Sequence, residues 1–75
     1  MRPDELLVDA REMMRECYAK SDVKEVALAL VAHAGQYVTA LLNNDALASR
    51  AFLLNVVALG ELLLARGELS GRTEG

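Results

Sequence analysis

Residues 26–60 read VALALVAHAGQYVTALLNNDALASRAFLLNVVALG, and the fold depends mainly on where this apolar stretch is buried. Of the 19 charged residues in the chain, 12 lie in residues 1–25 and five in residues 61–75. Only Asp45 and Arg50 carry charge within the stretch. Because apolar side chains are unfavourable in water, we expect most of this stretch to be buried in protein or in lipid.

The hydrophobic spacing predicts an all-α fold of three helices, at about 3–20, 22–42 and 45–66. Apolar residues recur at intervals of three and four through each of these segments, which is the pattern of a helix with one buried face. The turn at residues 43–45 is short. We therefore expect the second and third helices to form an antiparallel hairpin, with the first helix packed across it.

Local signals support these bounds and predict one domain. Asp22 and Asp45 are suited to N-caps, and Gly67 is suited to a C-cap after a helix ending at Arg66. Residues 1–69 are predicted to form a single helical domain, followed by a polar flexible tail at 70–75.

Helical periodicity also assigns candidate core faces. The broad apolar face of the second helix consists of Val23, Ala27, Leu30, Val31, Ala34, Tyr37, Val38 and Leu41. The corresponding face of the third helix consists of Phe52, Val56, Leu59 and Leu63. Cys17 falls on the apolar side of the first helix, so we expect a buried, unreactive thiol.

The opposite face of the third helix predicts a contact surface. Large aliphatic side chains lie there between isolated charges, a composition typical of interfaces rather than of solvated helix faces. The predicted interface consists of Leu47, Arg50, Leu53, Leu54, Val57, Glu61 and Leu64. A small domain with such a face is expected to complete its core as a homodimeric helical bundle with two-fold symmetry.

One polar pair is predicted inside the hairpin. A turn at 43–45 brings His33 level with Asn55, the polar side chain midway along the third helix. Buried polar groups usually pair with one another, so we interpret His33 and Asn55 as a pair that sets the hairpin register.

The composition argues against several functions. The net charge is −3, with 8 basic and 11 acidic residues and no basic cluster, so we expect no nucleic-acid binding. Cys17 is the only cysteine, which favours a reducing cytoplasm over a disulfide-stabilised secreted fold. The sequence shows no catalytic, cofactor or metal-ligand motif, and we expect a protein that is not an enzyme.

These observations leave three hypotheses for function. The first is a self-associating protein–protein interaction module, a small regulator or inhibitor that binds an unidentified protein partner. The second is a subunit or assembly factor of a larger complex. The third is a membrane helical hairpin, which we consider the weakest because Arg50, Asn55 and Glu61 interrupt the third helix and spanning helices should be apolar all round.

Overall fold

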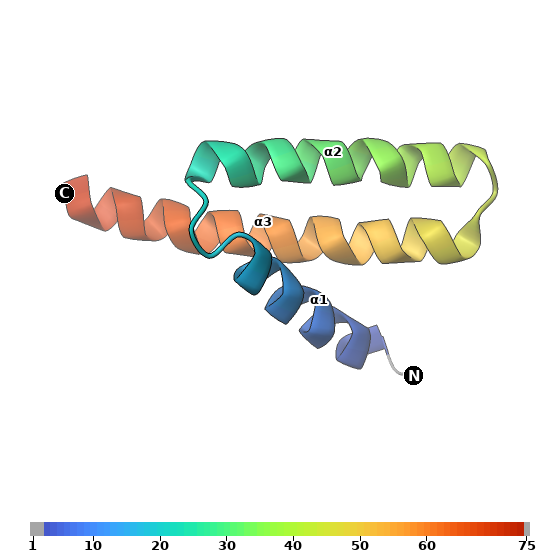
Figure 1. Ribbon diagram of the computed structural model, residues 1–75, viewed down its shortest axis with the longest axis horizontal. Helices are drawn as coiled ribbons and strands as arrows, with labels where there is room; N and C mark the ends of the chain where they lie inside the picture. Colours follow the sequence, from blue (N-terminus) through green and yellow to red (C-terminus); the bar gives the residue numbers. More distant parts are fainter. Residues whose placement is uncertain (1–2, 75) are drawn as a thin grey trace.

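The computed structural model describes residues 3–74, with side chains described for residues 5–67. It consists of three helices: α1 (Pro3–Cys17), α2 (Val23–Leu42) and α3 (Ala46–Glu74) (Figure 1). No strand occurs among residues 3–74. The predicted all-α class is confirmed.

The first helix ends three residues earlier than the predicted bound of residue 20. After Cys17 the chain forms a turn at residues 18–20 and reaches Asp22 in an extended conformation, with φ −83° and ψ 173°. The carboxylate of Asp22 accepts a hydrogen bond from the backbone N–H of Glu25 at 2.9 Å. Asp22 thus caps the start of α2, and the turn at residues 18–20 separates this cap from the end of α1.

The turn between α2 and α3 follows the predicted residues. Asn44 has a φ of 58°, the left-handed conformation that asparagine adopts more readily than most residues. Asp45 then accepts a hydrogen bond from the backbone N–H of Ala48 at 3.1 Å, which caps the start of α3.

The predicted end of the third helix is wrong. The helix continues through Gly67 to Glu74 instead of stopping at Arg66. A capping glycine takes a positive φ, and among the described residues no glycine has one. No proline follows to break the helix. Residues 70–74, predicted as a flexible tail, therefore belong to α3, and Gly75 lies outside the described residues.

The third helix is central in the arrangement. It packs against both α1 and α2, whereas α1 and α2 do not pack on each other within the described part of the chain. Figure 1 shows α2 and α3 side by side along the length of α2, with α1 crossing α3 obliquely on the side facing the reader. A helix contacted from two directions needs two apolar faces, which explains much of the apolar character of α3.

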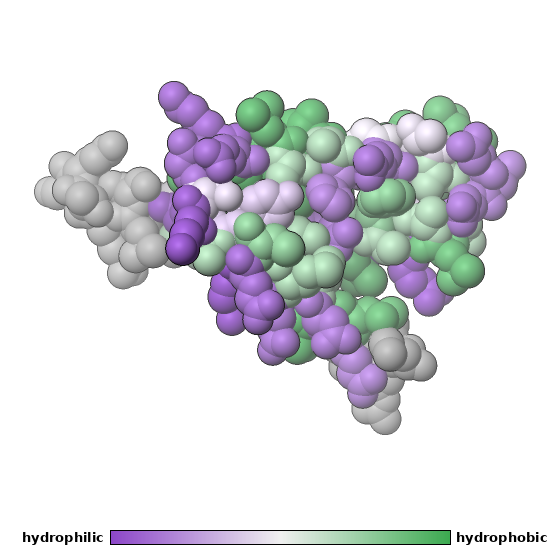
Figure 2. All heavy atoms as spheres, viewed as in Figure 1, coloured by the Kyte–Doolittle hydropathy of each residue, from purple (hydrophilic) through white to green (hydrophobic). Residues whose placement is uncertain are grey.

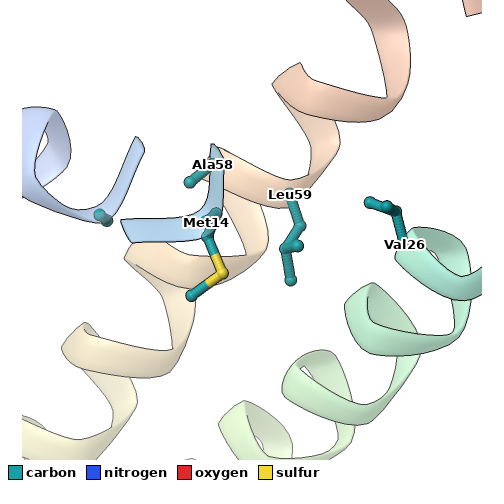
Figure 3. Packing of buried hydrophobic residues seen from close by; sticks show 5 residues of the cluster. Met14, Val26, Ala58 and Leu59 are labelled. Carbon is teal, nitrogen blue, oxygen red and sulfur yellow. The ribbon is translucent and has the colours of Figure 1, made fainter. Parts of the chain in front are cut away.

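The core is small and centres on Leu59 of α3. Leu59 lies between Met14 of α1 and Val26 of α2, as Figure 3 shows, and both Leu59 and Val26 are fully buried. Ala10 and Ala58 complete this buried cluster. Small side chains at the two positions allow α1 to approach α3 closely.

Two sequence-based core predictions are corrected. The predicted core face of α2 includes Val23, Val31, Val38 and Leu41, but these four side chains are exposed. The buried residues of α2 are Val26 and Ala40. Because α2 is apolar on nearly every side, periodicity alone does not identify the side that meets α3. Cys17 is also exposed rather than buried.

One arginine fastens the end of α1 to α3. Arg66 donates from Nη1 to the carbonyl oxygen of Ser21 at 2.6 Å and from Nη2 to the carbonyl oxygen of Tyr18. These carbonyls lie just beyond α1, where backbone acceptors lack helical partners. The guanidinium of Arg66, on α3, thus supplies hydrogen bonds to backbone carbonyls in the segment that connects α1 and α2.

Candidate protein interface

Large hydrophobic side chains are exposed mainly on α2 and α3. Within the described side chains, twelve such residues are exposed, and ten of them belong to these two helices. The ten are Val23, Leu28, Val31, Val38, Leu41, Leu42, Leu47, Leu53, Val57 and Leu64. Figure 2 shows hydrophobic side chains along the outer edge of α2, whereas α1 presents a largely hydrophilic surface. Soluble monomers rarely expose so many large apolar groups on neighbouring elements.

Most of the predicted interface lies on the surface of α3. Its exposed members are Leu47, Arg50, Leu53, Val57, Glu61 and Leu64. Leu47 and Leu64 are the most open hydrophobic residues of this set, at 80% and 71% exposure.

Leu54 is placed differently from its predicted companions. It is partly buried against the core cluster and borders a shallow hollow with Leu6, Ala10 and Met13 of α1. The side of α3 that carries Leu54 is therefore the side that α1 covers. Sequence reasoning grouped Leu54 with Val57 because it did not place α1.

The exposed side of α3 has a regular spacing. Six residues recur there at intervals of four and three, and all of them except the half-buried Gly60 are exposed. They are Ala46, Arg50, Leu53, Val57, Gly60 and Leu64. This is the spacing of a helix seam that packs against another helix. We call these six residues the α3 row.

The sequence pattern assigned to the core five residues of α2 that form a strip on its surface. Val31, at 66% exposure, and its neighbours Ala27, Ala34, Val38 and Leu41 form an apolar strip on this helix. The signal was present, because residues 26–42 contain no charged residue. It was interpreted as burial against α3 rather than as a surface. We call these five residues the α2 strip.

The α2 strip and the α3 row meet along their shared edge. Leu30 of α2 lies 3.8 Å from the position that a Cβ atom on Gly60 would occupy. Farther along, Leu41 of α2 and Ala46 of α3 line one shallow hollow. The two sets therefore adjoin at Leu41 and Ala46, and Leu30, which borders the α2 strip next to Val31, contacts the α3 row at Gly60.

An ion pair marks the boundary between this surface and α1. Arg11 donates from Nε to Glu61 Oε2 at 2.7 Å and from Nη2 to Glu61 Oε1 at 2.9 Å. The hydrogen bonds and the charge of Glu61 raise the pKa of Arg11 above its ordinary value. Both side chains remain partly accessible to solvent, at 41% and 43% exposure.

The structure brings His33 and Asn55 together inside the helix pair. Asn55 Nδ2 lies 3.5 Å from His33 Nδ1, which is at the long limit for a hydrogen bond. The His33 ring also packs against Phe52, with ring centroids 6.0 Å apart and an interplanar angle of 58°. Both polar side chains are partly buried. Their role in setting the register stays a prediction.

Two helices are long and apolar enough to cross a membrane by length and composition. These segments are Val23–Leu42, with a mean hydropathy of 1.3, and Ala46–Gly67, with a mean hydropathy of 1.7. Only 11% of each segment is buried within the protein. Both helices therefore carry apolar surface that the single chain leaves uncovered.

Comparison with known proteins identifies no relative. The chain matches no protein-family model, and no significant match is found among curated proteins or solved structures.

Proposed function

We propose that this protein is a non-enzymatic, self-associating protein–protein interaction module. Its α2 and α3 form an antiparallel hairpin, and two copies join through the α2 strip and the α3 row to make a homodimeric helical bundle. The observation that supports this proposal is the exposure of ten large hydrophobic residues on α2 and α3. Association through the α2 strip and the α3 row removes six of these ten residues from water, three on each helix.

In the proposed hairpin, both apolar sets lie on one side of the molecule. Helix residues are 100° apart around the axis. In an antiparallel pair that joins Leu30 to Gly60 and His33 to Asn55, the α2 strip and the α3 row then point the same way. α1 lies on another side, where it contacts Leu54, Ala58 and Leu62. The side opposite α1 is free to meet a partner.

The size of this surface fits a stable dimer. α2 contains 20 residues, so the surface is about 30 Å long at 1.5 Å per residue. Two adjacent helices are roughly 20 Å wide at the usual spacing. A standard interface buries about 800 Å² of accessible surface on each partner. The flat projection of this surface is roughly 600 Å². Its accessible area is larger, because side chains protrude from it, and so it is comparable with the standard value.

The surface of α1 leaves room for a further protein partner. In this proposal the dimer is a cytoplasmic regulator or inhibitor, and α1 presents its polar side to another protein. In the alternative, the module is a subunit or assembly factor whose apolar face meets a different chain. The behaviour of the isolated protein distinguishes these two proposals. An orphan subunit with this face uncovered aggregates, whereas a dimer stays soluble.

Light scattering after size-exclusion chromatography tests the proposal. We expect a soluble dimer for the natural chain and a monomer for Val31→Lys combined with Val57→Lys, which place charges on both helices of the interface. Val8→Lys is the matched control, because Val8 is similarly exposed but lies on α1. Far-UV circular dichroism verifies helicity in each variant. A natural chain that is monomeric at micromolar concentration contradicts the proposal.

A membrane hairpin is the second candidate, favoured by the two apolar helices of sufficient length. It is weakened by Arg50 and Glu61, which lie within the α3 segment. Each charge at the centre of a spanning helix costs about 2.5–3.5 kcal/mol on an insertion scale. Fractionation of cells expressing the chain separates the candidates. Recovery in the supernatant without detergent supports the module, and recovery only after detergent extraction supports the membrane hairpin.

A further inference from the structure

We infer that two copies pair α3 against α3 in antiparallel fashion around a two-fold axis at the level of Asn55, with Arg50 of each copy next to the partner's Glu61. This inference rests on the proposed self-association and specifies its symmetry and register. The occupant of the apolar surface is a second copy of this chain.

The spacing of the α3 row supports this register. Asn55 lies midway between Leu53 and Val57 and midway between Arg50 and Gly60. An antiparallel pair centred there places Leu53 against the partner's Val57 on both sides of the axis. Arg50 faces the partner's Gly60, whose lack of a side chain leaves room for the guanidinium. A surface that pairs with itself in this way meets the requirement of an isologous dimer.

The ends of the α3 row follow the same symmetry. Leu64 faces the partner's Ala46, so a large side chain meets a small one, with Leu47 at its edge. Both leucines are largely exposed in the single chain. The register therefore covers the most open hydrophobic residues of α3 in addition to Leu53 and Val57.

Charge complementarity fixes the direction of pairing. Arg50 is exposed, and no acidic group among the described side chains lies within ion-pair distance of it. Glu61 lies beside Gly60 and binds Arg11, but a carboxylate has acceptor sites for more than two donors. The antiparallel arrangement brings Arg50 next to the partner's Glu61 at two symmetric places. A parallel α3 pair instead brings Arg50 next to Arg50.

The same axis suits α2. Because His33 lies beside Asn55, an axis at the level of Asn55 also passes the level of His33. The pairs of the α2 strip nearest this level are Ala27 with the partner's Val38 and Val31 with the partner's Ala34, and both are centred between Ala32 and His33. Large side chains again meet small ones, which permits close packing between helices. One axis thus serves both helices of the hairpin.

Charge reversal in mixed dimers tests the register. Arg50→Glu alone places a second carboxylate against the partner's Glu61, and Glu61→Arg alone places a second guanidinium against the partner's Arg50. We expect the dimer dissociation constant of each variant to rise about tenfold or more, since like charges at an interface are repulsive. Mixing the two variants restores opposite charges between the subunits. We expect a heterodimer with an affinity within about threefold of the natural chain.

Sedimentation velocity of each variant, of their mixture and of the natural chain gives the dissociation constants. Glu12→Arg is the matched control, because it makes the same charge change as Glu61→Arg at an exposed position of α1, away from the α2 strip and the α3 row. Restoration in the mixture also shows that the Glu61→Arg variant folds despite the loss of its bond to Arg11. A dimeric natural chain with variants that dimerise unchanged, or that fail to recover on mixing, overturns the register but keeps self-association. A monomeric natural chain overturns both.

Discussion

Arg11 of α1 and Glu61 of α3 form a two-point ion pair, with Nε–Oε2 and Nη2–Oε1 distances of 2.7 and 2.9 Å. Because α1 packs on α3 and not on α2 within the described residues, this pair anchors α1 to α3, and the contacts of Arg66 anchor the segment after α1 to the same helix. α3 therefore positions α1 on one side and leaves its exposed row free on another.

Arg66 is expected to stabilise the connection between α1 and α2. Its guanidinium satisfies the carbonyl oxygens of Tyr18 and Ser21. Hydrogen bonds to charged groups contribute about 1.5–3 kcal/mol each, so Arg66→Met should lower the free energy of unfolding by at least about 1.5 kcal/mol. Arg66→Lys keeps the charge but lacks the planar guanidinium. Its free energy of unfolding should therefore lie between those of the natural chain and of Arg66→Met. Urea unfolding followed by circular dichroism measures both, and equal stability of all three proteins argues against this role.

Truncation of Leu59 is expected to lower the free energy of unfolding more than truncation of any other residue. It is fully buried between α1 and α2, so Leu59→Ala leaves a cavity at the centre of the core. Such truncations cost about 2–5 kcal/mol. Leu28→Ala is the control, because Leu28 is 71% exposed and lies outside the α2 strip, and it should change stability by less than about 0.5 kcal/mol. Thermal unfolding of the two variants should separate them clearly, and similar melting temperatures count against the described core.

Gly67 offers a test of the length of α3. Here Gly67 lies inside a helix that continues to Glu74, and nothing lies within 4 Å of an added Cβ atom. Gly67→Ala should therefore stabilise the protein by about 0.5–1 kcal/mol, because alanine is favoured over glycine in a helix interior. A capping glycine with positive φ predicts the opposite sign. Denaturant titration determines the sign, and a loss of stability rejects the extended α3.

Cys17 is expected to react readily in the folded protein. Its side chain is exposed at the end of α1. An aromatic disulfide reagent should modify the native thiol at a rate within about tenfold of the rate in denaturant, since access is not limited by unfolding. Cys17→Ser serves as the blank and should keep its helicity. Protection of the native thiol by several orders of magnitude would mean that Cys17 is buried.

The sequence predicts the helix count and the capping residues because these depend on local chemistry. The carboxylates of Asp22 and Asp45 bind backbone N–H groups three residues ahead, which any sequence reading can anticipate. The predicted end of the third helix is wrong because the residues there are compatible with two different local structures. Gly67 is suited to a cap, yet the chain beyond it contains nothing that prevents a helix.

The orientation of each helix depends on non-local contacts and is harder to predict. α2 is apolar on so many sides that its periodicity places Val31 in the core and leaves Val26 out, although Val31 is exposed and Val26 is fully buried. Six of the seven residues predicted for the α3 surface are exposed, and their role in an interface stays a prediction. Leu54 was misplaced because nothing in the local pattern shows where α1 crosses α3.

The mass of the natural chain in solution shows directly whether the protein forms the proposed dimer. Sedimentation velocity at micromolar concentration and physiological salt, without detergent, is the measurement. We expect a soluble species of about twice the chain mass of 8.1 kDa, in which the α2 strip and the α3 row are covered. A single species of 8.1 kDa that stays soluble over the whole concentration range would contradict it, because the apolar side opposite α1 would then need no partner.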